Sequence, residues 1–566
     1  MTLEERVGQL VMVDFSDAGV TPGFQASLAR HHWGGVILFA RNLKSSEQAS
    51  ALCASLQRAR GNAPPLFIGV DQEGGVVDRL PFDALASAPG AMALGATGIP
   101  DLAARTAFVS GRRLRDLGFN VNFAPCVDVN NNPLNPVIGI RSYGESADLV
   151  SRFAVAAARG YRAAGVIPCA KHFPGHGDTS LDSHLSLPVV PWHRARLEEV
   201  ELLPYRALIC DGVEMIMTAH IVYPALDPQN VPATLSEPVL SGLLRRELGF
   251  EGVIITDSMS MKAIADHYGV GPAAVMAIEA GADIVLACGS HESQVETVEA
   301  LLGAVRNGTI SEVRLDASLR RIARLKQATD EAGRWTCPHP IVAPAEFLRD
   351  PRAREIGAVA ALAARAAITL LRSDGTLPIE RSRRVSLFMP TLLPVSQLGE
   401  IAVPFPLRAA LAERGLDVSE HTWALQDEER PWPESLWESA GSSGGGSPDE
   451  RVLPSLADLG FCNVGADVAG ADVVVLCLYA RGRLSAFQRL LAAQLTRHAR
   501  ALVVVSLNSP YVLADVSDAG SFLCTYGYAG ATLEALADVL CGREKPQGRL
   551  PVTLPGLCER GHGLCV

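Results

Sequence analysis

The fold class can be read from one segment, Val150-Ser-Arg-Phe-Ala-Val-Ala-Ala-Ala-Arg-Gly-Tyr-Arg-Ala-Ala-Gly-Val-Ile-Pro-Cys-Ala-Lys171. Its first part, up to Ala164, is rich in alanine and arginine and has apolar residues at helical spacing, which predicts a helix. Residues Ile167–Lys171 form a short, mainly apolar run that predicts a buried strand. The segment is therefore one helix–strand unit of an α/β fold.

The same alternation of strand and helix recurs over the first ~330 residues. Eight strands are predicted, at Leu10–Phe15, Gly35–Ala40, Leu66–Val70, Val121–Pro125, Ile167–Lys171, Met215–His220, Val253–Asp257 and Ile284–Cys288. Most intervals between them can hold a helix, and Val295–Val305 supplies one after the last strand. Eight β/α units in this length favour a (β/α)8 TIM barrel, although a doubly wound sheet has the same pattern.

Polar residues stand where four of the predicted strands end. They are Asp71, Lys171 with His172, His220 and Asp257. Because the C-termini of all barrel strands open onto one face, we expect these side chains to converge there. The competing interpretation is that any strand must end in something polar.

A second α/β region follows a linker. Prolines at 338, 340 and 344 are typical of a segment that crosses the surface, and they place the linker at residues 336–351. Five further strands are predicted, at Ile368–Leu371, Val385–Met389, Val473–Tyr479, Leu502–Leu507 and Phe522–Tyr526. We therefore expect a barrel domain over residues 1–335 and a smaller layered α/β sandwich domain over residues 352–566.

Composition narrows the classes of function. Hydrophobic residues make up 48% and charged residues 20% of the 566 residues, as in well-cored globular proteins. A formal net charge of −11 and scattered arginines argue against a nucleic-acid partner, and no apolar run approaches the ~20 residues of a membrane span. The twelve cysteines form no CxxC pair, and the N-terminus lacks the features of a signal peptide. Together these features predict a reducing, cytoplasmic location.

The densest polar cluster is Lys171-His-Phe-Pro-Gly-His-Gly-Asp-Thr-Ser-Leu-Asp-Ser-His184, which directly follows a predicted strand. Its glycines and proline make it a loop. Three interpretations stay open on the residues alone. The histidines His172, His176 and His184 with the aspartates could hold a divalent metal, as in some barrel hydrolases. Asp182 and His184 could form a proton-transfer pair, because Asp-x-His places both side chains on one side of an extended segment. The loop could also be held by internal hydrogen bonds alone.

Three other segments carry candidate chemistry. Gly252-Val-Ile-Ile-Thr-Asp-Ser-Met-Ser-Met261 is an apolar strand that ends in Asp257, where a carboxylate could attack an anomeric carbon. The others are Ile68-Gly-Val-Asp-Gln-Glu-Gly-Gly75, with Arg79 close behind, and Asn135-Pro-Val-Ile-Gly-Ile-Arg-Ser-Tyr-Gly144. Each is weak alone, because an Asp after a strand is more often a helix N-cap than a nucleophile.

Together and in this order, the four segments resemble glycoside hydrolase family 3, in its β-N-acetylglucosaminidase branch. The signature of that branch runs Lys-His-(Phe/Ile)-Pro-Gly-(His/Leu)-Gly, four residues, then Asp-(Ser/Thr)-His, and Lys171–His184 matches every specified position. Thr256-Asp-Ser-Met259 resembles the nucleophile segment of the family. The resemblance spans the first ~330 residues and extends more loosely to the second domain.

The resemblance implies a retaining exo-β-N-acetylglucosaminidase that needs no metal and no other cofactor. Asp257 would form the glycosyl-enzyme, and His184, oriented by Asp182, would be the general acid/base. The resemblance also implies that five residues bind the hydroxyls and acetamido group of a small carbohydrate: Asp71, Arg79, Arg141, Lys171 and His172. The Asp-Ser-His element favours N-acetylglucosaminides over glucosides, and family membership suggests cell-wall fragments from peptidoglycan recycling or short chitin-type oligosaccharides as substrates.

One departure and three alternatives accompany this interpretation. The family usually has Arg after the double glycine, where this chain has Val76, which puts the local ion pairing in doubt. A phosphorylase would use the same residues, since a histidine that is neutral after proton loss tolerates an incoming phosphate. The other two hypotheses are a metal-dependent hydrolase and a sugar-binding protein without catalytic activity.

Overall fold

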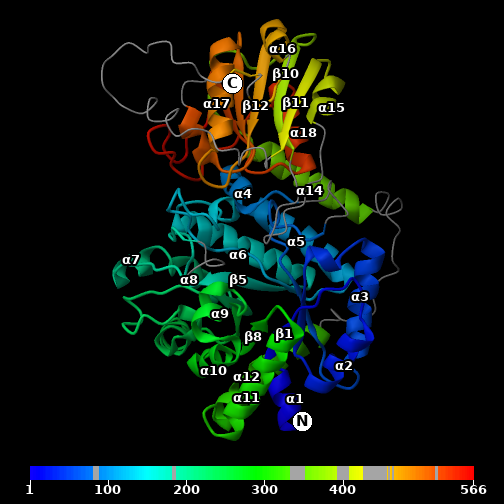
Figure 1. Cartoon of the computed structure of the whole chain (residues 1–566), viewed down its shortest axis with the longest axis vertical. Helices are drawn as coiled ribbons and strands as arrows, with labels where there is room; N and C mark the ends of the chain where they lie inside the picture. Colours follow the sequence, from blue (N-terminus) through cyan, green and yellow to red (C-terminus); the bar gives the residue numbers. More distant parts are fainter. Residues whose placement is uncertain are drawn as a thin grey trace. The chain divides into compact units, whose positions relative to one another are not determined.

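The computed structural model describes residues 1–80, 88–181, 187–331, 351–391, 407–424, 455–456, 459–461, 464–516 and 520–565 (Figure 1). The described chain divides into two compact units. The first takes in nearly all described residues up to Ala360, and the second takes in Ala96–Gly98 and the described residues from Ala361 onwards. The expected linker lies outside the described residues except for Pro351, where helix α14 (Pro351–Ala367) begins.

The first unit is built on a closed barrel of eight parallel strands. They are β1 (Val11–Val13), β2 (Gly35–Leu38), β3 (Phe67–Val70), β4 (Val121–Asn122), β5 (Ile167–Phe173), β6 (Met215–Thr218), β7 (Val253–Ser258) and β8 (Ile284–Ala287). Strand β1 pairs with both β2 and β8, which closes the sheet and confirms the predicted (β/α)8 barrel. Nearly every strand residue is buried, so these strands appear in the sequence as continuous apolar runs rather than alternating ones.

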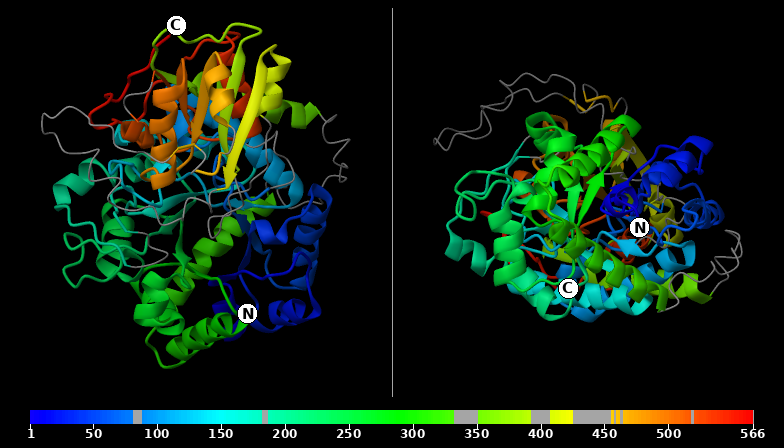
Figure 2. Two further views of the ribbon diagram at one scale, coloured as in Figure 1. Left: turned by 45° about the horizontal axis from the view of Figure 1, so that its top comes forward. Right: turned by 90° about the horizontal axis from the view of Figure 1, so that it is seen from below.

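Helices follow most of the strands and lie outside them (Figures 1 and 2). The longer ones are α2 (Pro22–His31), α3 (Ser46–Ala59), α5 (Pro100–Leu117), α6 (Ala147–Ala164), α8 (Leu203–Cys210), the π-helix η4 (Pro238–Glu247), α10 (Val270–Ala280), α11 (His291–Arg306) and α12 (Glu312–Glu331). Shorter ones are α1 (Leu3–Gly8), α4 (Ala91–Thr97), α7 (Arg194–Glu199), α9 (Lys262–Tyr268) and the 3-10 turns η1 (Ala40–Asn42), η2 (Gly139–Arg141) and η3 (Ala233–Leu235). None of the described helices has the length and apolar character that a bilayer crossing requires.

Helix α6 shows why the sequence forms these elements. Its N-cap is Ser146, whose side chain accepts a hydrogen bond from the backbone N–H of Leu149, so the helix begins three residues before the predicted start. It ends at Ala164 as predicted, because Gly165 then adopts a left-handed φ of 88°. Gly160 allows α6 to pack closely on α5, since a Cβ there would lie 2.3 Å from the carbonyl oxygen of Ala104. The α6 helix is thereby fixed directly before the strand that carries the polar loop.

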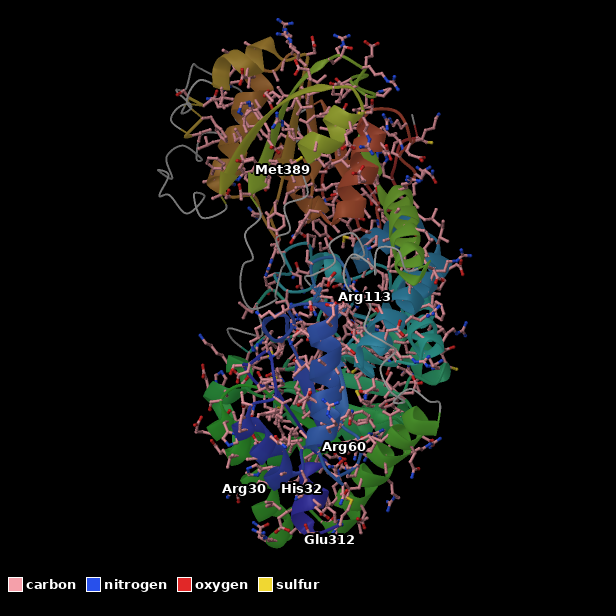
Figure 3. The ribbon with its side chains drawn as sticks, turned by 90° about the vertical axis from the view of Figure 1, so that its right-hand side faces the viewer. Arg30, His32, Arg60, Arg113, Glu312 and Met389 are labelled. Carbon is pink, nitrogen blue, oxygen red and sulfur yellow. The ribbon has the colours of Figure 1, made fainter. Side chains whose placement is uncertain are left out.

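The first and last helices of the barrel are joined by ion pairs. Arg6 of α1 lies 2.7 Å from Glu312 and 2.7 Å from Asp316, both on α12 (Figure 3 labels Glu312). Helix α1 itself is stabilised by a capping box, in which the side chains of Thr2 and Glu5 each accept a hydrogen bond from the other residue's backbone N–H. These contacts secure the N-terminal segment to the closed barrel.

A single buried carboxylate holds three arginines at the start of β8. Asp283 is fully buried, and its oxygens lie 2.5 Å from Arg245, 3.1 Å from Arg321 and 3.7 Å from Arg314. It also accepts the hydroxyl of Ser318 at 2.7 Å. Because a buried charge is costly unless it is paired, Asp283 links β8, α12 and the η4 helix into one network.

The second unit contains a six-stranded sheet in the order β11-β10-β12-β13-β14-β9. Its strands are β9 (Thr369–Arg372), β10 (Arg384–Thr391), β11 (Asp417–Ala424), β12 (Val473–Leu478), β13 (Leu502–Ser506) and β14 (Ser521–Cys524). All neighbours are parallel except β14 and β9. Five of the strands match the predicted ones, and β11 was missed because its polar, charged sequence is that of a sheet edge.

Helices cover both faces of this sheet, which confirms the predicted layered α/β architecture. They are α15 (Leu407–Glu413), α16 (Val464–Gly470), α17 (Ala486–His498) and α18 (Gly530–Leu540), with the 3-10 helix η7 (Pro510–Val516). Met389 of β10, labelled in Figure 3, belongs to the hydrophobic core that α15 and α18 cover. On the opposite face Phe388 packs against Phe461, with ring centroids 5.4 Å apart.

The Asp283 network yields the first testable prediction. We expect Asp283→Asn to destabilise the barrel by about 3–5 kcal/mol, because the three arginines lose their buried counter-charge. The measurement is urea unfolding, with the barrel transition fitted separately from that of the second unit. The control is Asp316→Asn, which removes a half-exposed partner of Arg6 and is expected to cost at most about 1 kcal/mol. Equal losses in the two variants would contradict the role given to burial.

Candidate functional site

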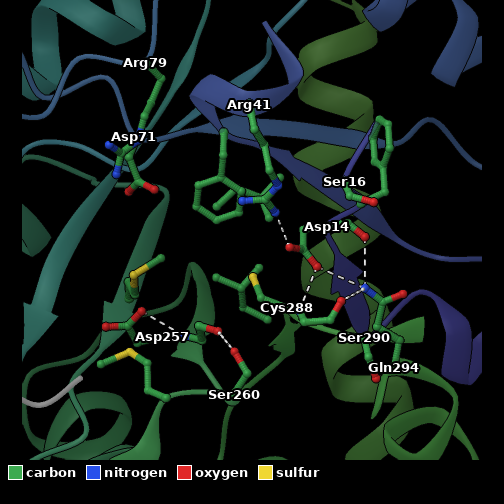
Figure 4. A pocket seen from close by; sticks show the side chains of 18 of the residues that line it. Asp14, Ser16, Arg41, Asp71, Arg79, Asp257, Ser260, Cys288, Ser290 and Gln294 are labelled. Carbon is green, nitrogen blue, oxygen red and sulfur yellow. Dashed lines mark hydrogen bonds and ion pairs between the residues drawn. The ribbon is translucent and has the colours of Figure 1, made fainter. Parts of the chain in front are cut away.

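A cavity of about 1060 Å³ opens at the C-terminal ends of the barrel strands. Its lining includes six of the residues predicted from sequence: Asp71, Arg79, Arg141, Lys171, His172 and Asp257. They come from four different β/α units, and Figure 4 shows the acidic groups of Asp71 and Asp257 on the same side of the cavity. The predicted pair Asp182 and His184 lies outside the described residues. The strand ends therefore bring Asp71, Lys171 with His172, and Asp257 to one cavity.

Lysine 171 is at the centre of a buried cluster of charges. Its Nζ lies 2.6 Å from Asp71 Oδ1 and 2.7 Å from Glu73 Oε1, and only 3% of its side chain is exposed. Arg141 donates two hydrogen bonds to Glu73, from Nε at 3.0 Å and from Nη2 at 2.8 Å. The cluster thus alternates cations and anions across the floor of the cavity.

These neighbours shift the pKa values of the buried groups. Burial alone would raise the pKa of Glu73, but Arg141 and Lys171 outweigh it and hold that pKa well below its usual range. Burial alone would lower the pKa of Lys171, but Asp71 and Glu73 outweigh it and raise that pKa above its usual value. Both side chains are therefore charged at neutral pH, and each is held in place by the other.

The double glycine after Glu73 explains how this carboxylate reaches the cavity. Gly74 and Gly75 have φ values of 86° and 60°, which residues with a Cβ rarely adopt. A Cβ on Gly75 would lie 2.7 Å from the Cα of Gly90. The chain therefore turns sharply after Glu73 and returns with Arg79 on the lining of the same cavity.

This chain has Val76 where the family usually has an arginine. Other residues supply the positive charges of the cavity. Arg79 is only 5% exposed, and Asp71 and Glu73 favour its charged form, although burial as the larger effect lowers its pKa. Together with Lys171 and Arg141 it gives three cations around two carboxylates. The site does not depend on an arginine at position 76 for its cluster of charges.

A second buried network surrounds Asp128, which the sequence analysis did not select. Its side chain is fully buried, and Oδ2 accepts hydrogen bonds from His172 Nδ1 at 2.7 Å and from the Cys126 thiol at 3.2 Å. Oδ1 accepts the backbone N–H groups of His172 at 3.2 Å and His176 at 2.6 Å. Burial would raise the pKa of Asp128, but His172 and the other donors outweigh it and lower the pKa to about 2.

The loop that leads to Asp182 and His184 is anchored at its base. Asn135 donates to the carbonyl of His176 at 2.8 Å, and His176 Nδ1 lies 2.9 Å from the hydroxyl of Thr179. Tyr223 donates its hydroxyl to the carbonyl of Gly175. A Cβ on Gly177 would lie 1.7 Å from the carbonyl oxygen of Val129, so the backbone passes too close for any side chain. The described part of the loop is therefore fixed up to the residues before Asp182.

Asp257 lies near the end of β7 and is positioned by its backbone surroundings. Its Oδ1 accepts the N–H of Ser258 at 2.7 Å. The carbonyl of Ser258 in turn lies 2.9 Å from Nε2 of His220, whose Nδ1 is 2.9 Å from the hydroxyl of Thr234. His220 is not among the residues that line the cavity, so this strand-end residue supports the backbone next to Asp257 rather than facing the cavity.

The opposite end of the cavity holds an ion pair that sequence reasoning missed. Asp14, at the end of β1, lies 2.5 Å from Arg41 and accepts hydrogen bonds from the N–H of Gly289 at 2.9 Å and from Gln294 at 3.0 Å (Figure 4). Burial is the main cause of its raised pKa. The rule used for the other strands, a polar residue where an apolar run ends, would have found Asp14.

Of the residues proposed as metal ligands, His172 and His176 lie side by side, with ring centroids 5.8 Å apart, whereas Asp182 and His184 lie outside the described residues. The described group whose potential ligand atoms lie within 4.8 Å of one another is Cys126, Asp128 and His172. His176 is not part of this group, and burial lowers its pKa to about 4. Asp128 already accepts four hydrogen bonds within the group and from the backbone, so the donor set is arranged as a hydrogen-bond network.

Comparison with known proteins assigns the chain to a family. The model of the glycosyl hydrolase family 3 N-terminal domain matches residues 2–325, and that of the family 3 C-terminal domain matches residues 274–560. The chain belongs to glycoside hydrolase family 3. It is therefore a glycoside hydrolase, as the resemblance of the four segments had implied.

Two known proteins are similar over nearly the whole chain, and a third over 57% of it. A protein of Pseudoalteromonas piscicida named β-hexosaminidase A is 31% identical, over 98% of this chain and 97% of the relative. The solved structure of a family 3 β-N-acetylglucosaminidase from Paenibacillus sp. str. FPU-7 is 37% identical with a TM-score of 0.86, over 98% of this chain and 99% of that one. A β-hexosaminidase of Nitrosomonas eutropha is 34% identical, over 57% of this chain and 96% of the relative.

The charge cluster of this family 3 enzyme gives the second prediction. Because the pKa of folded Glu73 lies below the unfolded value of about 4.3, its contribution to stability is present above that pH and is lost as the pH falls below it. We expect Glu73→Gln to be about 3–5 kcal/mol less stable than wild type at pH 7, and this difference to narrow as the pH falls below about 4.3. Urea unfolding at pH 7, 5, 4 and 3.5 would measure it.

The control for this experiment is Glu299→Gln, which changes an exposed side chain on α11. It should alter stability by at most about 0.5 kcal/mol at every pH. A difference between Glu73→Gln and wild type that stays constant down to pH 3.5 would show that Glu73 is not held ionised by its cations.

Proposed function

We propose that this chain is a retaining exo-β-N-acetylglucosaminidase, which removes a non-reducing terminal N-acetylglucosamine through a covalent glycosyl intermediate on Asp257. The observation that carries the proposal is the placing of Asp257 in one cavity with Asp71, Lys171 and His172. Support also comes from the Lys171–His184 signature and from the names of the similar proteins, β-hexosaminidase and β-N-acetylglucosaminidase.

The cluster of charges provides the means to bind one sugar. Charged hydrogen-bond donors and acceptors in fixed positions suit sugar hydroxyls, each of which both donates and accepts. We assign Asp71, Arg79 and Lys171 to this binding, together with Arg141 and His172. These groups hold one another in place before the substrate arrives. The sugar therefore does not have to order these side chains when it binds. The carboxylate of Asp257 stands at the edge of this cluster, where the anomeric carbon would lie.

The reaction then proceeds in two steps. In the first, Asp257 attacks the anomeric carbon while His184, oriented by Asp182, protonates the departing oxygen. In the second, the now neutral His184 removes a proton from water, which attacks the glycosyl-enzyme and releases the sugar with its configuration retained. A histidine suits this role because after donating its proton it is neutral and does not repel the carboxylate of Asp257.

The barrel domain, residues 1–335, is proposed to carry all of this chemistry, and the domain over 352–566 to have a supporting role. The substrates proposed are cell-wall fragments of peptidoglycan recycling or short chitin-type oligosaccharides. A cytoplasmic location is proposed as well, because ten described cysteines are free thiols, six of them buried, which suits a reducing compartment.

A test of the nucleophile combines a variant with product analysis. We expect Asp257→Ala to lower kcat on p-nitrophenyl β-N-acetylglucosaminide by at least about 10³-fold, because the covalent step is lost. NMR of the wild-type reaction should show the β-anomer first. The control, Asp266→Asn, changes an exposed residue on α9 and should leave kcat unchanged. An α-anomer as first product would refute the retaining mechanism, and a sugar 1-phosphate formed when phosphate is present would select the phosphorylase instead.

The general acid/base can be tested with leaving groups of different acidity. We expect His184→Ala to slow hydrolysis of N,N′-diacetylchitobiose by about 10²–10⁴-fold, because its poor leaving group needs protonation. Release of dinitrophenolate from the 2,4-dinitrophenyl glycoside should show a burst, with the glycosyl-enzyme visible by mass spectrometry. The control is His267→Ala on α9. If His184→Ala hydrolyses both substrates equally slowly and shows no burst, His184 is not the general acid/base.

A further inference from the structure

We propose that Asp128 is a positioning residue that keeps a hydrogen on Nδ1 of His172, so that Nε2 of this ring faces the cavity as a hydrogen-bond acceptor. Only the kinetic consequence of this proposal rests on the proposed function. The state of the ring itself can be observed without any substrate.

The contacts of Asp128 leave it a single protonation state. Asp128 is the acceptor in three of its four hydrogen bonds, from two backbone N–H groups on Oδ1 and the Cys126 thiol on Oδ2, while His172 Nδ1 is the second partner of Oδ2. Two of these donors, the amides of His172 and His176, cannot reverse their direction. The carboxylate is fully buried, so water does not compete for its oxygens. It therefore remains ionised and acts only as an acceptor.

An acceptor at this place fixes the hydrogen of the histidine. With Oδ2 at 2.7 Å, Nδ1 of His172 must be the protonated nitrogen of the ring. In a neutral imidazole the other nitrogen then carries a lone pair. Nε2 lies 3.5 Å from Nη2 of Arg141, a group that can only donate, so the surroundings of Nε2 also suit an acceptor.

The ring of His172 lies among one guanidinium and three titratable groups. The charged or titratable side chains that face His172 are Asp128, Arg141, His176 and Cys126. An added hydrogen on Nε2 would point toward the guanidinium of Arg141, which is always charged. Lys171 and Arg141 are committed to Glu73 as donors, so a neutral His172 adds an acceptor for a sugar hydroxyl beside donors that are already placed.

Asp128→Asn is the informative substitution, because it keeps the shape of the side chain and replaces one hydrogen-bond acceptor by a donor. If the amide oxygen accepts the two backbone N–H groups, the amide NH₂ faces Nδ1 of His172 and forces the hydrogen onto Nε2. The ring would then present a donor to Arg141 and to the substrate. We expect kcat/KM to fall by about 10- to 100-fold, the loss typical when the hydrogen-bond partner of a metal-binding histidine is replaced.

The experiment measures the ring nitrogens directly by ¹⁵N NMR of histidine-labelled full-length enzyme at pH 8. The resonances of His172 are those that vanish in His172→Gln. We expect a protonated Nδ1 and an unprotonated Nε2 in wild type, and the reverse in Asp128→Asn. A doubly protonated ring or a hydrogen on Nε2 in wild type would overturn the proposal, and this holds even if Asp128→Asn does not fold.

A matched control separates positioning from stability. Asp227 is also buried and accepts the hydroxyl of Ser236 at 2.6 Å, but it does not line the cavity. Asp227→Asn should lower the melting temperature without changing the His172 resonances or kcat/KM. If Asp128→Asn behaves in the same way, Asp128 is structural only and the proposal fails. If the ring hydrogen moves from Nδ1 to Nε2 in Asp128→Asn, but even the wild-type enzyme hydrolyses no glycoside, the proposed function fails and the positioning role of Asp128 stands.

Discussion

The ion pairs among Lys171, Glu73, Arg141 and Asp71 are the constraint on which the cavity depends. Buried charges are tolerated only when each is matched, and here the partners come from β3, from β5 and from the connection after β4. Each strand end must therefore arrive at a set position before any of these charges is satisfied. The same matching fixes the donors and acceptors that meet a substrate, so the requirement for a stable fold and the requirement for recognition are met by one set of contacts.

Much of the fold could be predicted because barrel strands are buried on both faces. Runs such as Val253–Ile255 contain no polar residue, and the helix before β5 has a clear apolar face. Strand boundaries were harder to predict: β4 covers only Val121 and Asn122, although Ala124 and Pro125 still accept backbone hydrogen bonds from Cys169 and Lys171. Strand β11 was not foreseen, because an edge strand can alternate polar and apolar residues and so resembles a loop.

A site residue was predictable where it met two conditions: a titratable side chain, and a position at the end of an apolar run that predicts a strand. Asp71, Lys171 and Asp257 meet both conditions. Asp128 does not, because it follows β4 by several residues and acts on the cavity only through His172, a relation that no local pattern records. Glu73 was visible within its motif, yet its pairing with Arg141 joins residues 68 positions apart and becomes evident only in three dimensions.

The hydrogen bonds of Asp14 have a consequence for the order in which this protein is made. Asp14 leaves the ribosome early, but its partners Gly289 and Gln294 are synthesised some 275 and 280 residues later. Likewise, the second edge of strand β1 can pair only after β8 has been synthesised. The nascent barrel can therefore not close until β8 has been synthesised, and the face that carries the cavity is completed only with this last β/α unit.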